Sequence, residues 1–459
     1  MNDLTEGPIP GHILRMAMPI AIGMVFQTAY YLVDLYFVGQ LGDTAIAGLG
    51  SAGNVAFLVM AITQILGVGT MALIAQASGR KDRVDANLIF NQSLVLAAVC
   101  AAITLAGGYG LAGWYMGTLG ADAATEAAGI TYLYWFVPGL ALQFALISMG
   151  SALRGTGIVN PTIVVQVLTV ILNAILSPIM ITGWGTGRPM GIAGAGLSST
   201  ISIAVAIVLM TAYFVRLEHY VTFNWAMVRP RIDAWKRILA VGIPPGGEFA
   251  LMFVYMAIIY WTIRDFGPEA QAGFGIGSRV MQAIFLPAMA IAFATAPVAG
   301  QNVGAGKADR VRGTFKTAVI SLSAIMFVLT LLCQLRPAVL IAFFTDDAEV
   351  IRDGAGFLRI ISWNFVATGI VFTCSGMFQA LGHTVPSLIA SATRLITFAI
   401  PAVWLSRQSW FQLDHLWYAS VATVALQAGV AWWMLSIQLD RRLADLPPAA
   451  LPIPAGQVG

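Results

Sequence analysis

A repeat at one fixed spacing runs through this largely apolar chain. Four groups of residues recur 225 positions later in the chain. The paired groups are Pro19 and Pro244, residues 45–50 and 270–275, Gln76 with Gly79 and Gln301 with Gly304, and Gly157 with Pro161 and Gly382 with Pro386. A single offset shared by four groups predicts two copies of one structural unit. A polar residue that occurs in one copy only is therefore not required by the shared fold.

The composition excludes a water-soluble body. Of the 459 residues, 58% are hydrophobic and 10% are charged, whereas a soluble domain carries about 25% charged residues. The apolar runs are about 20 residues or longer, which lets each helix satisfy its own backbone within a bilayer. We predict an all-α polytopic membrane protein with twelve transmembrane helices. The predicted spans are 14–38, 45–75, 88–113, 127–152, 160–183, 190–216, 236–262, 271–300, 315–343, 353–381, 386–406 and 416–440.

These spans divide into two pseudosymmetric six-helix lobes. We predict an N-lobe at 1–216, a cytoplasmic linker at 217–235, a C-lobe at 236–440 and a flexible tail at 441–459. Sixteen Lys and Arg residues fall on the side of both termini and six on the other side, so the positive-inside rule puts both termini in the cytoplasm. We expect a multi-pass protein of the cell inner (plasma) membrane. A parallel repeat of this kind is typical of transporters.

Several other classes of protein and partner are not indicated. The net charge of +3 is small, and it predicts no nucleic-acid partner. Cys100, Cys333 and Cys374 lie in apolar segments without metal or redox spacing, so we expect no cofactor. We expect a monomer whose partners are membrane lipid and a small-molecule substrate.

Asp34 is the first candidate functional residue. It is the one charged residue in a long apolar run, and a charge in mid-bilayer costs at least roughly 2.5–3.5 kcal/mol on insertion scales. Helical spacing puts Gln27, Tyr30, Tyr31 and Asp34 on one face. The position that corresponds to Asp34 in the second copy is Ile259, so the fold does not require an acid there. We predict an ion-coupling site, and a structural carboxylate at the helix end is the alternative.

Three further residues are predicted to share the depth of Asp34. Asn173 and Ser177 lie one turn apart on the fifth span, and Asn54 lies in the outer half of the second span. Together they predict a small polar cavity around the acid. Hydrogen bonding between helices is the alternative for each amide. We assign Gln27 and Asn54 to a substrate cleft.

Glu248 marks a second candidate site. It follows Pro244-Pro245-Gly246-Gly247, which interrupt regular helical hydrogen bonding and leave carbonyl groups to be satisfied nearby. Glu248 is either an ion or substrate site or the partner of Arg394 in a buried pair. Arg279 is interpreted as an anchor at the outer headgroups.

The motifs resemble those of the MATE (multidrug and toxic compound extrusion) family of the MOP flippase superfamily. The segments that carry the resemblance are 19–34, 38–42, 67–70, 75–79, 153–157 (LRGTG), 160–161, 191–196 and 300–306. The resemblance implies two six-helix lobes that form a V and the export of cationic or amphipathic drugs in exchange for H⁺ or Na⁺. It also implies that Asp34 is the ion-coupling acid and that Asn173 is its neighbour.

The chain departs from the family pattern in two places. Many members carry an acid where this chain has Ser177, and members with an ion site in the C-lobe carry an acid on the tenth span, where residues 357–380 have none. With one acid and few oxygen ligands, coupling to H⁺ through Asp34 is favoured, and Na⁺ bound at Asp34 is the alternative.

The sequence offers less support for three other functions. A flippase or exporter of a lipid-linked sugar or other amphiphile would need a strongly basic cavity, for which Arg279 and Arg394 are thin support. A membrane-embedded enzyme would need a nucleophile with its base or a set of metal ligands. The four histidines, His12, His219, His383 and His415, lie instead at loops or span ends. A passive channel would need a filter-like segment, which the sequence does not offer.

Overall fold

The computed structural model describes residues 1–119 and 122–444, apart from the side chains of Tyr31, Asp34, Leu35, Asp43 and Leu119. Every regular element in the described part is helical. The first half contains α1 (Ile9–Gly39), α2 (Asp43–Gly79), α3 (Arg83–Leu119), α4 (Ala123–Gly155), α5 (Asn160–Ile181) and α6 (Ile192–Arg216). The second half contains α7 (Ile232–Ile263), α8 (Pro268–Gly304), α9 (Ala308–Leu335), α10 (Pro337–Ala342), α11 (Ala348–Ile361), α12 (Asn364–Ala380), α13 (Val385–Leu405) and α14 (Leu413–Ala444). Two short 3₁₀ helices, η1 (Trp225–Met227) and η2 (Arg264–Phe266), complete the order.

The number of spans agrees with the prediction. In the described residues, eleven helices are long and apolar enough to cross a membrane, and α11 with α12 makes a twelfth span that is bent by 56°. The predicted tenth span, 353–381, therefore consists of two helices joined at a bend. The predicted ninth span was too long, because it runs through Pro337, which begins α10 and cannot supply an N–H inside a helix. At the end of the chain, residues 441–444 continue α14, and the rest of the predicted tail lies outside the described residues.

The repeated glycines are positions where helices of one half pack closely. A Cβ atom at Gly48 of α2 would lie 3.0 Å from the backbone nitrogen of Gly129 of α4. In the second half, a Cβ atom at Gly273 of α8 would lie 2.9 Å from the nitrogen of Gly354 of α11. Both members of the first pair are 225 positions from their counterparts, so the two halves repeat the same close contact. This explains why the segment 45–50 recurs with small residues.

The second repeated motif forms a tight turn between two helices. Gly157 and Gly382 adopt φ angles of 78° and 68°, a left-handed conformation that glycine adopts without steric cost. Pro161 and Pro386 then occupy the first turn of α5 and α13, where a missing N–H is not needed. The recurrence of these residues therefore reflects a shared turn and not a shared binding site.

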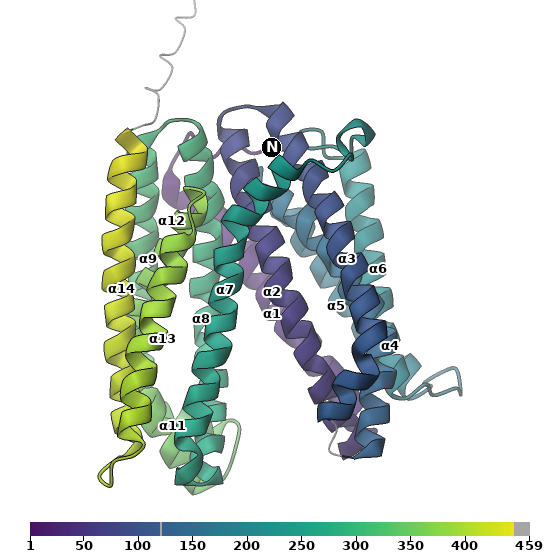
Figure 1. Cartoon of the computed structure of the whole chain (residues 1–459), viewed down its shortest axis with the longest axis vertical. Helices are drawn as coiled ribbons and strands as arrows, with labels where there is room; N and C mark the ends of the chain where they lie inside the picture. Colours follow the sequence, from purple (N-terminus) through teal and green to yellow (C-terminus); the bar gives the residue numbers. More distant parts are fainter. Residues whose placement is uncertain (120–121, 445–459) are drawn as a thin grey trace, which may run out of the picture.

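The two halves pack together at the end of the bundle where residue 1 lies, which we call the closed end (Figure 1). At this end α1 and α7 each cross to the opposite half. Ile13 and Met16 of α1 belong to the buried core of the second half, and Ile238 and Val241 of α7 belong to that of the first. The crossing is reciprocal because Ile13 and Ile238 are 225 positions apart.

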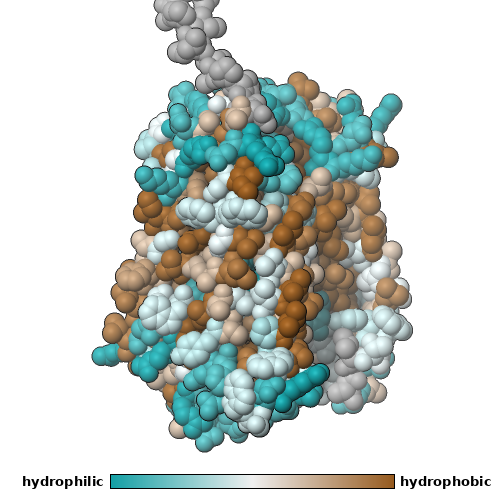
Figure 2. All heavy atoms as spheres, turned by 60° about the vertical axis from the view of Figure 1, so that its left-hand side comes forward, coloured by the Kyte–Doolittle hydropathy of each residue, from teal (hydrophilic) through white to brown (hydrophobic). Residues whose placement is uncertain are grey.

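Away from the closed end the two halves separate. The rings of Phe57 on α2 and Phe253 on α7 meet edge to face with their centroids 5.6 Å apart. Toward the end opposite the closed end, the helices of the two halves diverge in Figure 1, and Figure 2 shows the surface hollowed between them. We call this end the open end.

The linker between the halves is held along α3 by three amide side chains. Asn91 accepts a hydrogen bond from the backbone N–H of Asn224 at 2.8 Å and donates to the carbonyl oxygen of Thr222 at 2.9 Å. Asn87 and Gln92 likewise donate to and accept from the linker backbone. Nothing in the sequence marks these amides as partners of the linker, yet they fix the start of α7 on the first half.

Replacing Asn91 with leucine is expected to destabilise the fold by about 2–3 kcal/mol, because the N–H of Asn224 and the carbonyl of Thr222 lose a buried partner. The measurement is thermal unfolding of the purified protein in detergent. Asn54→Leu is the matched control, since Asn54 is exposed on α2. Equal melting temperatures for the two variants would contradict this role for Asn91.

Candidate functional site

A buried cluster of amide and hydroxyl groups lies between α5 and α6. Asn173 is 1% exposed and Ser177 is fully buried. The hydroxyl of Ser177 donates to Oδ1 of Asn173 at 2.7 Å, and Nδ2 of Asn173 donates to Oγ of Ser199 at 3.3 Å. Oγ of Ser177 also lies 3.3 Å from Oγ of Ser198. We call Asn173, Ser177, Ser198 and Ser199 the α5–α6 polar cluster.

Sequence reasoning identified the α5 members of this cluster and missed those on α6. Ser198 and Ser199 belong to a Ser-Ser-Thr triplet within an apolar run. This triplet is the sequence feature that could have identified them. Both serines are fully buried. A buried hydroxyl or amide without a partner costs about 1–3 kcal/mol, so the mutual hydrogen bonds keep the cluster polar at low cost.

The predicted acid lies on the neighbouring helix α1. The backbone of Asp34 is helical, but its side chain and that of Tyr31 lie outside the described residues. Tyr30 is half-buried. Earlier on α1, exposed Gln27 accepts a hydrogen bond of 3.5 Å from Gln166 of α5. Thus α1 runs beside the helix that carries Asn173.

The second candidate site lies between α7, α13 and α14. Ser387 lies beside the carboxyl group of Glu248, and Oε1 of that group is buried without a hydrogen bond. Two turns farther along the same face of α7, the ring of Tyr255 lies 4.4 Å from the guanidinium carbon of Arg394. The hydroxyl of Tyr255 is 2.8 Å from Oγ of Ser420.

Glu248 and Arg394 do not form the buried pair that was one reading of the sequence. No ion pair within 4.0 Å joins their described side chains, and Arg394 packs on Tyr255 instead. The separation follows from position, because Arg394 is seven residues, about 10 Å, beyond Ser387 on α13. Glu248 and Arg394 therefore each lie within a membrane span without the other as a partner.

Two other predicted residues lie at the surface. Asn54 on α2 and Arg279 on α8 are both exposed. Among the described residues, neither forms a hydrogen bond with the α5–α6 polar cluster. The structure therefore does not bring Asn54 into the described cluster, although it was predicted at the same depth.

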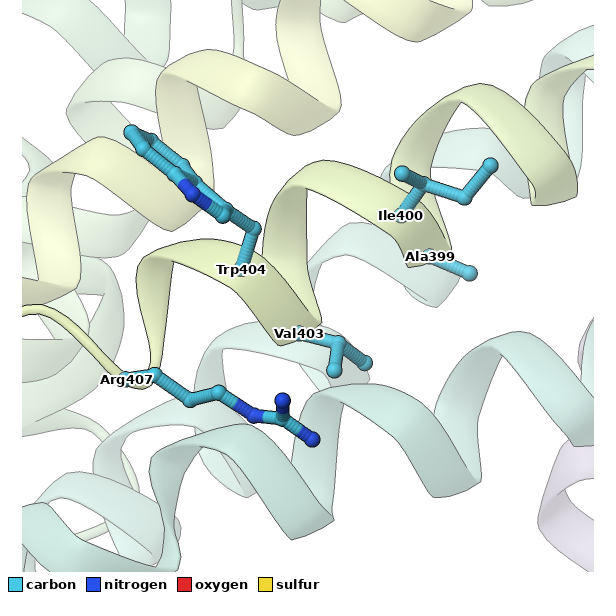
Figure 3. Close-up of a pocket in the computed structure, with 5 residues that line it drawn as sticks. All are labelled: Ala399, Ile400, Val403, Trp404 and Arg407. Carbon is cyan, nitrogen blue, oxygen red and sulfur yellow. The ribbon is translucent and has the colours of Figure 1, made fainter.

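A groove at the surface of the second half contains none of the residues of the α5–α6 polar cluster. It follows α13 and is lined by Ala399, Ile400, Val403, Trp404 and Arg407 (Figure 3). An adjoining groove shares Val403 and Arg407 and is completed by residues of α7. The walls of both grooves are apolar except for the guanidinium group of Arg407, just beyond the end of α13.

Comparison with known proteins places the chain in one family. The MatE family model matches residues 19–179 and 244–405, so the two matches begin 225 positions apart. A protein of Shewanella oneidensis named FAD transporter is 25% identical over 405 residues, which cover 87% of this chain and 88% of that protein. Multidrug export protein MepA of Staphylococcus saprophyticus is 25% identical over 376 residues and 81% of each chain.

A solved structure agrees with the fold. A MOP superfamily transporter from Pyrococcus furiosus superposes with a TM-score of 0.87 at 25% identity, covering 96% of this chain and 98% of that one. The prediction of an all-α membrane protein built from two repeated halves is confirmed, and so is the resemblance seen in the motifs. The chain belongs to the MATE family, and it is a membrane transporter and not an enzyme.

Proposed function

We propose that this protein is a secondary active multidrug efflux antiporter, which exports cationic or amphipathic compounds in exchange for H⁺ by alternating access. The observation that carries the proposal is the buried α5–α6 polar cluster beside the helix that contains Asp34. Relatives of similar length named for multidrug export and for multidrug resistance support the class of substrate. A hydrogen-bonded cluster of neutral groups next to one acid is suited to a proton that binds and leaves.

The hydrogen bonds of the cluster favour H⁺ over Na⁺. Oδ1 of Asn173 accepts from Ser177, and Oγ of Ser199 accepts from Asn173. A cation would need these oxygen atoms as ligands, and binding it would require the hydrogen bonds to be rearranged. A proton on Asp34 needs no such set of ligands. Na⁺ at Asp34 remains the alternative.

We further propose that the closed end faces the cytoplasm. Cationic side chains gather at this end, among them Arg80, Arg237, Lys307, Arg310 and Arg312, as the positive-inside rule requires of a cytoplasmic face. The two lobes of the predicted domain division then rock so that this end and the open end open in alternation. The conformation described here is accordingly open to the outside.

In this scheme the proton and the drug use alternate states of the two lobes. A proton entering from the open end binds Asp34 and changes the hydrogen bonding predicted among Asp34, Asn173 and either Tyr30 or Tyr31. The proton supplies direction to the extent that its affinity differs between the two states. The drug is released outward before the lobes close at the open end.

The experiment is efflux of a fluorescent cationic dye from proteoliposomes, driven separately by a pH gradient and by a Na⁺ gradient. We expect the pH gradient alone to drive efflux. Efflux that requires a Na⁺ gradient would mean that Na⁺ is the coupling ion, and the protein would still be a drug antiporter. If neither gradient drives the dye, the proposal of drug antiport is wrong.

Transport of an anionic aromatic compound is the second candidate. The guanidinium group of Arg394, stacked on Tyr255, is not paired with a described carboxylate within 4.0 Å. Arginine binds phosphate groups well and also stacks on aromatic rings. The relative named FAD transporter supports this class. Gradient-driven uptake of FAD in place of the dye would favour it.

A further inference from the structure

The segment that precedes α1, residues 2–7, lies across the closed end and contacts both halves. We call it the strap. On the side of the first half, the backbone N–H of Asn2 donates to the carbonyl of Thr156 at 2.9 Å. The side-chain amide of Asn2 donates to the carbonyl of Gly157 at 3.0 Å. Both acceptors lie in the turn between α4 and α5.

The contacts of the strap with the second half are more numerous. The N–H of Leu4 donates to Oε1 of Gln301 at 3.0 Å, and the carbonyl of Leu4 accepts from Nδ2 of Asn302 at 3.2 Å. Arg310 donates to the carbonyl groups of Gly7 and Leu4 at 2.9 and 3.3 Å. The side chain of Leu4 is 3% exposed and is part of the core of the second half.

Gln301 connects the strap to a symmetric pair of contacts between the halves. Its Nε2 donates to the carbonyl of Gly155, at the end of α4, at 3.0 Å. Gln76, which is 225 positions earlier, donates in the same way to the carbonyl of Ala380, at the end of α12, at 2.7 Å. Each glutamine therefore binds the last turn of a helix in the opposite half. Gln301 differs in that its carbonyl oxygen also holds the strap.

The strap also occupies a notch that glycine creates. A Cβ atom at Gly157 would lie 2.9 Å from the carbonyl oxygen of Asn2. At the equivalent Gly382, the neighbouring atom is Nε2 of Gln76, at 3.1 Å. The same turn therefore receives the strap in the first half and a glutamine side chain in the second.

Charge on the strap is complementary to both halves. Asp3 accepts from the N–H and the hydroxyl of Thr5 at 2.8 and 2.7 Å. Burial acts to raise the pKa of Asp3, but the bonds from Thr5 and the charges of Lys81 and Lys307 hold it below its usual value. Lys81 belongs to the first half and Lys307 to the second, so one carboxylate attracts a cation from each.

We propose that residues 2–7 are a latch that holds the closed end shut and sets how often the two halves part there. Opening this end separates Thr156 and Gly157 from Gln301, Asn302 and Arg310, so the strap must release one set. It continues into α1, whose first turns pack on the second half. The strap therefore stays with the second half and releases the two carbonyl groups of the first. The inference rests on the alternating access of the proposed function.

The test compares two arginines on α9. Arg310→Gln removes the donors to Gly7 and Leu4, whereas the matched control Arg312→Gln removes an ion pair with Asp440 inside the second half. Spin labels at Val84→Cys and Asp309→Cys, both exposed at the closed end of different halves, report the separation in proteoliposomes. The three native cysteines are replaced by alanine. We expect Arg310→Gln to raise the ratio of open to closed molecules about tenfold, which corresponds to about 1.4 kcal/mol, and Arg312→Gln to leave it unchanged.

A second variant tests the notch without removing a charge. Gly157→Ala places a methyl group against Asn2, and Gly185→Ala is its control, because Gly185 has a similar φ of 75° and no atom within 4 Å of its Cβ position. The same increase is expected for Gly157→Ala alone. The latch would be overturned if the distance between the spin labels were unchanged in both Arg310→Gln and Gly157→Ala. It would also be overturned if Arg312→Gln and Gly185→Ala changed that distance equally. The measurement uses neither substrate nor gradient, so failure of drug antiport would not produce that result.

Discussion

Asp34→Asn is expected to reduce pH-driven dye efflux to the level of empty liposomes while leaving the protein folded. Asparagine has nearly the same size and keeps hydrogen-bonding capacity, but it cannot take up a proton. The partners predicted for Asp34 in the α5–α6 polar cluster are neutral, so none of them replaces the lost titration. The measurement is the initial rate of efflux under a pH gradient, with dye binding measured separately.

The control for this prediction is Asp309→Asn, an exposed acid in the first turn of α9. We expect it to retain wild-type efflux. Dye binding that persists in Asp34→Asn would separate the loss of coupling from the loss of the substrate site. Full gradient-driven efflux in Asp34→Asn would refute coupling through this residue. Glu248, whose Oε1 is buried without a hydrogen bond among the described residues, would then be the next candidate for the coupling acid.

The repeat allowed the sequence to predict the fold because its anchors are backbone requirements. Gly157 and Gly382 occupy turns with positive φ, and Gly48 and Gly273 permit close helix packing. Such positions tolerate few residues, so they recur in both copies. The spans were predictable for a different reason, since a bilayer imposes a minimum length of apolar helix.

The bend in the tenth span was not predictable, because distant residues stabilise it. Between α11 and α12, the carbonyl of Ser362 accepts a hydrogen bond from the hydroxyl of Thr330 at 3.0 Å. Gln334 donates to the carbonyl of Arg359 at 2.6 Å and to Oγ of Ser362 at 2.8 Å. Thr330 and Gln334 lie on α9, so the donors that satisfy the broken helix are about 30 residues away in sequence. The local sequence pattern around the bend gives no indication of such distant donors.

The candidate site was predictable in part, for a similar reason. Asn173 stood out because an amide is rare in an apolar run, and Ser177 followed from helical spacing. Ser198 and Ser199 did not stand out, because small hydroxyl residues are common where membrane helices pack. Their contacts with Asn173 and Ser177 depend on α6 packing beside α5, which the local sequence does not specify.

Gly79→Ala and Gly304→Ala are expected to abolish efflux and to open the closed end. A Cβ atom at Gly79 of α2 would lie 1.9 Å from the carbonyl oxygen of Gln301, and one at Gly304 of α8 would lie 2.0 Å from that of Gln76. Ordinary contact begins near 3.4 Å, so the two helices must move apart by about 1.5 Å. Both obstructing atoms belong to backbone, which cannot rotate away. Dye efflux and the distance between labels at Val84→Cys and Asp309→Cys measure the two effects.

Loss of efflux in these variants would show that packing between the halves outweighs the gain in helix stability. Alanine favours a helix by about 0.5–1 kcal/mol over glycine, so on that ground alone both substitutions would stabilise the protein. Gly53→Ala on the same helix is the control, because a Cβ atom there meets nothing within 4 Å, and it should keep full efflux. Since Gly79 and Gly304 are related by the repeat, their variants should show similar separations. Wild-type distances and efflux in both would mean that α2 and α8 need not be in contact during transport, and a closed end sealed by these backbones would then be excluded.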